Sequence, residues 1–486
     1  MPHFFHIQNF GCRAARADGE AIATMLRASE TAEGLPAEAD VVIVNTCSVT
    51  AEADREARAW IRRAHRLNPN ARIIATGCYA QRAPGELAAL PGVSAVVGNS
   101  HKAFAPEIAL GLMKPGTCAT SSENHLLQIQ TMQAAAAPMV LADDTFAHSF
   151  LAEAPIVPGA QTRPNLKIQE GCSNRCSFCV IPQTRGSSRS LPGPAVLAHI
   201  RGFVEAGGNE LVLSGINLGR WGRDLAPDPR TIRTLAALVR AIFEQTALPR
   251  LRLSSVEPMD WDADLIALMR EFSATRLARH VHLPLQSGSD SVLRRMYRRY
   301  RPWHYAEKVA ELLDAAGPGL TLGADVMVGF PGETDREFQE SCEFIRSLPF
   351  GYLHLFPFSP RPGTRAWALN AENPVPSTVV NERMATLRAL AAEKTRSHRA
   401  QFVGAELEAI TLHTPPPIAG VGRTSALTEN FLPVELACEL PANQLIRTRI
   451  RGLALDETLV GVPAAGLHFH TVQAGFTLEP QLENAF

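Results

Sequence analysis

The sequence predicts a multidomain α/β protein with an N-terminal open α/β sheet, a central full or partial β/α barrel and a small C-terminal β-barrel. Three observations lead to this prediction. Short apolar runs alternate with helix-like stretches near the N-terminus, and the alternation returns from about Arg163 to about Arg396. From about Gly404, short alternating strands are separated by Gly and Pro turns. The length of 486 residues also favours several domains over one.

The N-terminal domain is expected over residues 1–115. Residues 41–44 (VVIV), 72–75 (RIIA) and 95–97 (AVV) are short apolar runs typical of strands that a parallel sheet buries on both faces. The charged segment 54–67 between two of these runs is expected to be a helix. This strand–helix–strand order predicts an open sheet whose strands are parallel.

The remaining boundaries follow changes in sequence texture. Residues 116–160, with SSEN, a QAAAA run and scattered prolines, are expected to form a linker or insertion. The central domain is expected over 161–400 and the OB-type barrel over 401–486. Expected strands are 166–169, 211–213, 250–253, 280–283, 324–328, 353–356, 407–412, 432–436 and 445–450, and a long helix is expected over 384–399.

Composition limits the function classes. Hydrophobic residues make up 46% and charged residues 20% of the chain, as in a globular protein with a large core. No apolar run approaches the ~20 residues that cross a membrane, and the start of the chain lacks signal-peptide features. We therefore expect a cytoplasmic protein without a membrane partner. The net charge of −1 means that any nucleic-acid contact must come from local basic patches.

Nine cysteines in a long chain do not form a disulfide scaffold, so clustered cysteines indicate metal binding or chemistry. Cys172, Cys176 and Cys179 lie in GCSNRCSFCVIP, on a loop expected after a strand. Three thiolates at this spacing can hold one iron–sulfur cluster, and a closed cluster would need a fourth. One iron is then free to bind a small molecule. A closed zinc site is disfavoured because no His lies in the loop.

A second set of cysteines is dispersed: Cys12 in NFGCR, Cys47 in VNTCSVT and Cys78 in ATGCYA. Each follows an expected strand, and the carboxyl ends of parallel strands face one crevice. A single cysteine there is more often a small core residue. Three at three such ends indicate a second metal cluster, again with one open iron.

The chain as a whole resembles the radical S-adenosylmethionine methylthiotransferase family along nearly all its length. NTCSVT and the Cys172 loop match the family's two cluster motifs. The other matching blocks, in the family's order, are PQTRGSSRS, NELVLSGINLGRWG, RLSSVEP, HLPLQSGSDSVLRRMYRRY, DVMVGFPGETDREF and HLFPFSPRPGTRA. The segment GRTSALTENFLPVEL is similar to the family's RNA-binding β-barrel, the TRAM domain. NTCSVT, GINLGRWG and SPRPGTRA are most similar to the branch that acts on N6-threonylcarbamoyladenosine in tRNA.

This resemblance implies a reaction and its cofactors. Two 4Fe–4S clusters and S-adenosyl-L-methionine are implied, with the Cys172 triplet on the radical cluster and the Cys12 triplet on an auxiliary one. One S-adenosylmethionine gives a methyl group to sulfur at the auxiliary cluster, and a second gives a deoxyadenosyl radical. The radical abstracts hydrogen from C2 of the modified adenine. Implied partners are the tRNA anticodon loop, an electron donor such as flavodoxin or ferredoxin, and a sulfur donor.

Several further residues are candidates for the cofactor pocket within this family pattern. Phe178, between two cluster cysteines, can shield the cluster or simply pack in the core. Glu210, which ends GGNE before a strand, can hold amino or ribose groups of the cofactor, or be an ordinary surface carboxylate. Ser254, Gln286 and Arg298 are the other candidates.

Candidate RNA contacts come from two basic stretches. The segment around Arg294, Arg295, Arg299 and Arg301 interleaves arginines with tyrosines that can neutralise phosphates and stack on bases, although a solvated helix face would have the same pattern. In the acidic C-terminal segment, the arginines 447, 449 and 451 alternate and are expected to share one face of a strand. Arg447, Arg449 and Arg451 are therefore the candidate RNA contacts in this segment.

Two alternative functions remain open from sequence. One is methylthiolation of another target, either isopentenyladenosine in tRNA or an aspartate of a ribosomal protein. The other is a non-catalytic iron–sulfur RNA-binding protein or redox sensor, which two open-iron triplets disfavour. Cys118, Cys342 and Cys438 have no assigned role and are expected to be structural.

Overall fold

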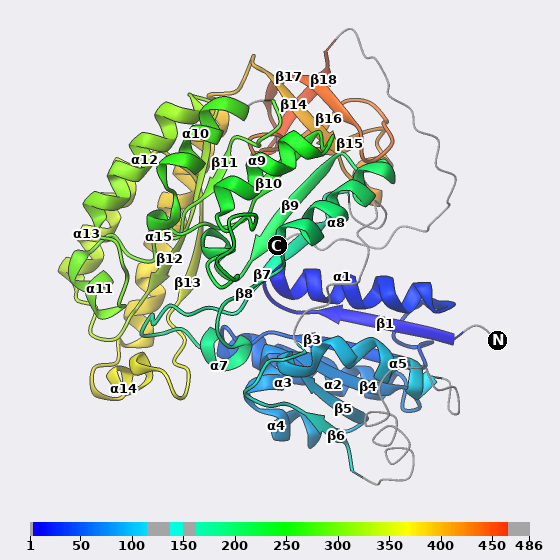
Figure 1. Ribbon diagram of the computed structural model, residues 1–486. Helices are drawn as coiled ribbons and strands as arrows, with labels where there is room; N and C mark the ends of the chain where they lie inside the picture. Colours follow the sequence, from blue (N-terminus) through cyan, green and yellow to red (C-terminus); the bar gives the residue numbers. More distant parts are fainter. Residues whose placement is uncertain (1–2, 114–136, 149–161, 274, 465–486) are drawn as a thin grey trace. The chain divides into compact units, whose positions relative to one another are not determined.

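The computed structural model describes residues 3–113, 137–148, 162–273 and 275–464 (Figure 1). The chain divides into two compact units that interleave in sequence. The first comprises Met1–Pro155, Gln169–Arg189 and Ser359–Trp367, and the second comprises Ile156–Ile168, Ser190–Phe358 and Ala368–Phe486. The domain boundaries expected from sequence stay predictions, and Cys118 lies outside the described residues.

The first unit contains a parallel sheet in the order β2-β1-β3-β4-β5-β6. Its strands are β1 (His3–Asn9), β2 (Thr31–Glu33), β3 (Val41–Thr46), β4 (Arg72–Gly77), β5 (Val93–Gly98) and β6 (Met139–Leu141). The three strands predicted here are confirmed as β3, β4 and β5, each two or three residues longer. β6 falls within the predicted linker or insertion and pairs with β5 at the edge of the sheet.

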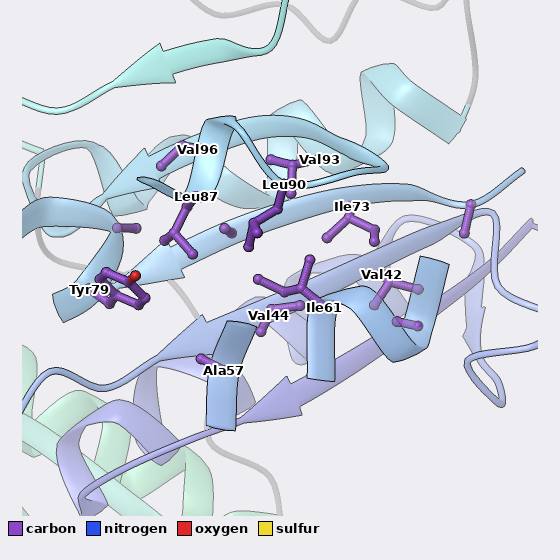
Figure 2. Packing of buried hydrophobic residues seen from close by; sticks show 14 of the residues in the cluster. Val42, Val44, Ala57, Ile61, Ile73, Tyr79, Leu87, Leu90, Val93 and Val96 are labelled. Carbon is purple, nitrogen blue, oxygen red and sulfur yellow. The ribbon is translucent and has the colours of Figure 1, made fainter. Parts of the chain in front are cut away.

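Helices cover both faces of this sheet. They are α1 (Arg13–Ala28), α2 (Ala51–Leu67), α3 (Cys78–Arg82), α4 (Pro84–Ala88), η1 (Asn99–Phe104) and α5 (Ala105–Met113). Successive strand residues point to opposite faces, so Val42 and Val44 pack with Ile61 of α2, whereas Val41 and Ile43 pack with α1 and α5. Figure 2 shows the α2 side of the core, where Ile61 lies against the sheet. Burial on both faces explains the continuous apolar runs of these strands.

The second unit contains repeated strand–helix pairs. Its central strands form a sheet in the order β10-β9-β7-β8 and a parallel sheet in the order β11-β12-β13. These strands are β7 (Asn165–Glu170), β8 (Arg189–Ser190), β9 (Glu210–Gly215), β10 (Arg250–Leu253), β11 (His280–His282), β12 (Thr321–Val328) and β13 (Phe350–Pro357). The alternation confirms the predicted partial β/α barrel.

Helices follow these strands in turn. They are α7 (Ile181–Arg185), whose residues belong to the first unit, and then α8 (Gly193–Glu205), η2 (Leu218–Arg220), α9 (Leu235–Gln245), η3 (Pro258–Asp260), α10 (Ala263–Phe272), α11 (Asp290–Arg295), α12 (Pro302–Ala316), α13 (Asp335–Ser347), α14 (Arg365–Glu372) and α15 (Ser377–Ala400). The long helix predicted before the C-terminal barrel is confirmed as α15. Cys342 of α13 is buried, as expected of a structural residue.

The C-terminal strands form a closed barrel in the order β14-β15-β16-β18-β17. They are β14 (Glu406–Thr411), β15 (Thr424–Thr428), β16 (Pro433–Leu436), β17 (Leu445–Leu453) and β18 (Leu459–Pro463), with the short helix α16 (Pro416–Ala419). Cys438 packs against the apolar core of this barrel. The predicted small β-barrel is confirmed. In the part of the chain that the structure describes, no helix is both long enough and apolar enough to cross a membrane.

Candidate functional site

Cys12, Cys47 and Cys78 lie at the carboxyl ends of three neighbouring strands. Cys12 directly precedes α1, Cys47 follows the last residue of β3, and Cys78 follows the last residue of β4. β1, β3 and β4 are adjacent in the sheet, and the last residues of β3 and β4 are paired in register. The sheet therefore presents three thiols at one edge, where open α/β sheets bind ligands.

Gly11 makes room for this arrangement. Its φ is +101°, a conformation that residues with side chains rarely adopt. A Cβ on Gly11 would lie 2.6 Å from Cβ and 2.8 Å from Sγ of Cys47. The glycine before Cys12 thus allows the β1–α1 turn to approach the second cysteine closely.

The three thiols interact electrostatically. Burial raises the pKa of Cys47 to about 12, and the neighbouring thiols Cys78 and Cys12 add to the increase. Three thiolates in one place repel each other unless a cation is present. Metal ligation deprotonates thiols and supplies that positive charge. The three thiols are therefore a donor set that a metal cluster can use once its positive charge deprotonates them.

Cys78 receives two hydrogen bonds that sequence reasoning missed. Nε of Arg185 donates to Sγ of Cys78 at 3.3 Å, and Nδ2 of Asn99 donates to the same sulfur at 3.4 Å. Asn99 also donates to the carbonyl of Thr184 at 2.8 Å. Groups that donate to ligand sulfurs hold the ligand in place and tune a bound cluster.

A buried ionic network holds Arg185 in position. Its Nη1 lies 2.6 Å from Glu170, and both terminal nitrogens lie 3.3 Å from Asp18, which also pairs with Lys102. These four charged side chains are fully buried or nearly so. Burial acts to lower the pKa of Arg185, but Cys78, Glu170 and Asp18 outweigh it and hold that pKa well above its usual range.

The second cysteine triplet lies on the loop between β7 and α7. Cys172, Cys176 and Cys179 are all half-buried, and the amide of Cys179 donates to the carbonyl of Cys176 at 3.1 Å. The Cys172 amide donates to the Gly186 carbonyl at 3.0 Å, which closes the loop at its base. Phe178 is also half-buried, so its side chain is not a fully enclosed core residue. The loop is compact and presents its thiols to an accessible surface.

Polar side chains without partners follow three strands of the second unit. Ser214 is the next-to-last residue of β9, Ser254 directly follows β10, and Gln286 lies four residues after the end of β11. Oγ of Ser214, Oγ of Ser254 and Oε1 of Gln286 are buried and have no hydrogen-bond partner among the described residues. Buried polar atoms are almost always hydrogen-bonded. A polar cofactor at the carboxyl ends of these strands would satisfy them, so Ser254 and Gln286 fit the predicted role.

Gln286 also has an unusual backbone. Its φ is +65°, in the left-handed region. Hydrogen bonds fix it, because its amide donates to the Asp325 carbonyl at 2.7 Å and its carbonyl accepts from the Met327 amide at 2.8 Å. Such conformations concentrate at ligand sites, where the surrounding structure holds them in place.

The comparisons with known proteins agree with this geometry. Residues 4–98 match the family model described as uncharacterized protein family UPF0004, and residues 166–345 match the radical SAM superfamily. The threonylcarbamoyladenosine tRNA methylthiotransferase MtaB of Bacillus subtilis is 36% identical over 84% of this chain and 84% of its own. This chain belongs to the radical SAM methylthiotransferase family. It is therefore a radical SAM enzyme whose family acts on tRNA. The family implies S-adenosylmethionine and a 4Fe–4S cluster as its cofactors.

The names of other relatives of this methylthiotransferase specify two different modified adenosines in tRNA. MtaB of Aquifex aeolicus is 33% identical over 85% of this chain and 91% of its own. A tRNA-2-methylthio-N(6)-dimethylallyladenosine synthase of Sorangium cellulosum is also 33% identical, over 84% of this chain and 82% of its own. Among solved structures, the radical S-adenosylmethionine methyltransferase TsrM of Kitasatospora setae is 14% identical with a TM-score of 0.50, covering 76% of this chain and 78% of that one. That likeness supports the fold.

The structure corrects the predicted cofactor role of Glu210. Glu210 is the first residue of β9, at the opposite end of the strand from Ser214. Its buried carboxylate lies 2.9 Å from Arg252, 3.3 Å from Arg250 and 3.7 Å from Arg163. Burial acts to raise its pKa, but these arginines, with Arg252 first, lower it to about 2. Glu210 is part of a structural ionic network.

This network joins the central strands to the C-terminal barrel of the methylthiotransferase. Arg250 also pairs with Glu408 of β14, and Arg252 donates to the carbonyl of Thr428 in β15 at 3.2 Å. The Arg252 guanidinium lies 5.3 Å from the ring centre of Phe431. Buried charges are found in proteins where partners of opposite charge compensate them. Here the central strands supply some of these partners and the C-terminal barrel supplies others.

Arg298 also has a structural environment. The side chain is buried, pairs with Glu257 at 2.6 Å and donates to Oη of Tyr300 at 3.1 Å. Its charge is therefore balanced by a protein carboxylate. This geometry favours a role in shaping the loop after α11 over the predicted cofactor contact.

Each of the arginines around α11 that were predicted to contact RNA lies beside a carboxylate of the protein. Arg294 and Arg301 both pair with Asp290, and Arg295 pairs with Glu337 through two nitrogens. Arg299 instead lies 3.6 Å from Asp260. All four arginines are therefore paired with carboxylates of the protein, and their contact with RNA stays a prediction.

The arginines of β17 do share one face, as predicted. Arg447, Arg449 and Arg451 are exposed and alternate with buried residues. Arg449 pairs with Glu406 on the neighbouring strand at 2.9 Å. Their contact with RNA stays a prediction.

Proposed function

We propose that this enzyme converts N6-threonylcarbamoyladenosine beside the tRNA anticodon into its 2-methylthio derivative. The observation that carries the proposal is the meeting of Cys12, Cys47 and Cys78 at the carboxyl ends of three adjacent strands, in addition to the radical SAM cysteine loop. A radical alone would not require a second cysteine triplet. A reaction that also needs a sulfur donor would.

In this proposal, Cys172, Cys176 and Cys179 hold the radical 4Fe–4S cluster, and Cys12, Cys47 and Cys78 hold an auxiliary one. When bound, the cofactors supply the deoxyadenosyl radical and the methylated sulfur. The protein binds and orients them. Ser214, Ser254 and Gln286 offer buried oxygen atoms to S-adenosylmethionine, while Phe178 shields the radical cluster.

Arg185 and Asn99 orient the sulfur of Cys78 in this proposal. Two donors on one ligand sulfur withdraw electron density and fix its direction. The ionic partners of Arg185 keep its guanidinium from turning toward solvent. A reductant of the flavodoxin or ferredoxin class and a separate sulfur donor complete the reaction.

The choice of modified adenosine as the proposed substrate is based on the names of the relatives. The relatives from Bacillus subtilis and Aquifex aeolicus are named for threonylcarbamoyladenosine. The dimethylallyladenosine synthases of Sorangium cellulosum and Cereibacter sphaeroides, at 33% and 34% identity, favour isopentenyladenosine as the second candidate. Similar identities on both sides make the substrate a question for experiment.

The test is deletion of the gene followed by mass spectrometry of tRNA nucleosides. Loss of 2-methylthio-N6-threonylcarbamoyladenosine, with accumulation of its unmethylthiolated parent, is expected. Cys12→Ala and Cys172→Ala should each fail to restore it. Loss of the methylthio-isopentenyl nucleoside would instead establish the second candidate. No change in either nucleoside would reject both and direct attention to a ribosomal protein target.

The number of iron–sulfur clusters is tested separately, by measuring the iron content of the enzyme. Reconstituted enzyme should hold about eight iron atoms per chain, and a triple Cys12, Cys47, Cys78→Ala variant about four. The variant should still cleave S-adenosylmethionine under reduction. An unchanged iron content would reject the auxiliary cluster.

A further inference from the structure

Three arginines of the second unit converge on one carboxylate. Arg220 Nε lies 3.6 Å from Asp260, Arg223 Nη2 lies 3.1 Å from it, and Arg299 Nη1 lies 3.6 Å from it. We call these four residues the Asp260 arginine cluster. The Asp260 side chain is fully buried, whereas the side chains of Arg223 and Arg299 are 54% and 48% exposed.

The cluster carries surplus positive charge. One carboxylate faces three guanidinium groups, and a small pocket beside them is lined by Arg233 and Asp262 as well as Arg223 and Asp260. Four arginines against two aspartates leave a charge of +2. Arg270 and Arg336, which are more exposed, each lie beside one exposed carboxylate, Asp314 and Glu340. The Asp260 arginine cluster differs from these pairs because three arginines surround one fully buried carboxylate.

Asp260 orients these arginines. Because its carboxylate is buried, it anchors the inner side of the guanidinium groups and leaves their outer sides toward solvent. Nη2 of Arg233 extends the group by donating to the Arg223 carbonyl at 3.5 Å. A preorganised set of guanidinium groups loses little side-chain entropy when it binds an anion.

The cluster lies in the loops that follow β9 and β10. η2 with Arg220 comes shortly after β9, and η3 with Asp260 comes shortly after β10. These are the strands whose carboxyl ends carry Ser214 and Ser254. In β/α barrels, the loops at this end build the active site. The pocket is also lined by Thr234 and Asp262, which cap the N-termini of α9 and α10, where backbone amides favour anions.

We propose that the Asp260 arginine cluster binds backbone phosphates of the tRNA substrate close to the base that is modified. The inference rests on the proposed function, because it assigns the partner to tRNA. A polyanion suits a half-exposed patch with two surplus charges, and phosphate matches the planar fork of arginine. Of the basic stretch predicted around α11, Arg299 is the member that lies in this cluster.

The experiment measures binding of a full-length tRNA transcript to the cluster-reconstituted enzyme by fluorescence anisotropy over a range of salt concentrations. The Arg223→Ala/Arg299→Ala double variant should weaken binding roughly 10-fold or more at low salt and reduce the slope of log K against log salt by about 1.5. Arg223→Lys/Arg299→Lys should restore most of the slope, because lysine keeps the charge.

The control removes the same charge elsewhere. Arg270→Ala/Arg336→Ala should leave the affinity within about twofold and the slope unchanged. The inference is overturned if the double variant at Arg223 and Arg299 binds and responds to salt like this control. It is also overturned if the double variant lowers the thermal midpoint of unfolding but leaves tRNA binding unchanged. The arginines would then only hold the loops together.

Failure of the inference can be separated from failure of the proposed function. If wild-type enzyme methylthiolates tRNA and the cluster variants bind it normally, only the inference fails. If wild-type enzyme cleaves S-adenosylmethionine but neither binds nor modifies tRNA, the proposed function fails and the inference fails with it.

Discussion

Arg185 donates a hydrogen bond from Nε to Sγ of Cys78 at 3.3 Å, across 107 positions in sequence. The same guanidinium pairs with Glu170, the last residue of β7, and with Asp18 of α1. One buried side chain therefore connects a proposed auxiliary-cluster ligand to the strand that leads into the radical SAM cysteine loop. The two cysteine sets share a common support within the first unit.

Arg185→Met should destabilise the protein strongly. The change leaves Glu170 buried without its arginine, and removal of one partner from a buried ion pair typically costs about 3–5 kcal/mol. Denaturant unfolding of the cluster-free protein measures this loss. The exposed Arg336→Met change is the control and should have little measurable effect. Equal effects of the two changes would mean that the buried network does not support the fold.

Asn99→Ala should lower the reduction potential of the auxiliary cluster. Hydrogen bonds to ligand sulfurs stabilise the reduced state of a cluster, and this change removes one of the two on Cys78. A potentiometric titration followed by electron paramagnetic resonance reports both clusters separately. The potential of the radical cluster should not move. Asn68→Ala, which removes a side-chain hydrogen bond to the Ala39 carbonyl, should shift neither potential.

Gly11→Ala should remove the auxiliary cluster selectively. The new methyl group would lie within 2.8 Å of Sγ of Cys47, on a backbone with positive φ that alanine disfavours. Reconstituted iron should fall from about eight to about four atoms per chain. Reductive cleavage of S-adenosylmethionine should continue. Gly85→Ala is the matched control, because nothing lies within 4 Å of its added Cβ.

The core of the first unit could be predicted because strands that are buried on both faces have a recognisable apolar sequence pattern. β3, β4 and β5 are apolar on both faces and appear as continuous runs such as VVIV. β1, with the sequence HFFHIQN, is partly exposed at most positions and carries two histidines, so its signal is weaker. β6 has only three residues and follows a long segment without a clear pattern. The sequence predicts a ligand set from Cys12, Cys47 and Cys78 because three core cysteines at the ends of three strands would be a coincidence.

The contacts that organise charge could not be predicted in the same way. Arg185 and Cys78, or Arg223 and Arg299, come together only through the packing of distant segments. The sequence predicts a cofactor contact for Glu210 because this residue ends GGNE just before an expected strand. The fold instead puts it at the start of β9, among three arginines. Local sequence identifies a residue at a strand boundary, but not the partners that tertiary packing brings to its side chain.

Glu210 should make the stability of the protein depend on pH in the acid range. Its pKa is about 2 in the folded state, against 4.5 for the unperturbed group. Because the folded pKa is lowered, the stabilisation is complete above the unfolded value and is lost as pH falls from about 4.5 toward 2. Glu210→Gln should flatten this part of the curve of unfolding free energy against pH, and lower stability at neutral pH.

Asp314→Asn provides the comparison for Glu210, because Asp314 forms an exposed pair with Arg270. Its stability curve should follow that of the wild-type protein. A Glu210→Gln curve that also follows the wild-type protein between pH 4.5 and 2 would mean that the ionic network contributes nothing to acid stability.

Ser254→Ala should weaken cofactor binding without harming the fold. Oγ of Ser254 is buried without a partner among the described residues, so its removal costs the empty protein no hydrogen bond. The thermal midpoint of the cofactor-free protein should stay equal or rise. Loss of one hydrogen bond to S-adenosylmethionine should raise its dissociation constant roughly 2- to 10-fold.

Ser341→Ala is the control and should affect stability instead of cofactor affinity, because Oγ of Ser341 forms hydrogen bonds with Ser287, Gly288 and the Glu337 carbonyl. That variant should lose stability and keep its affinity. If Ser254→Ala lowered the midpoint and left the affinity intact, Ser254 would be a structural residue, and the unpartnered oxygen atoms after β9, β10 and β11 would not form the cofactor pocket.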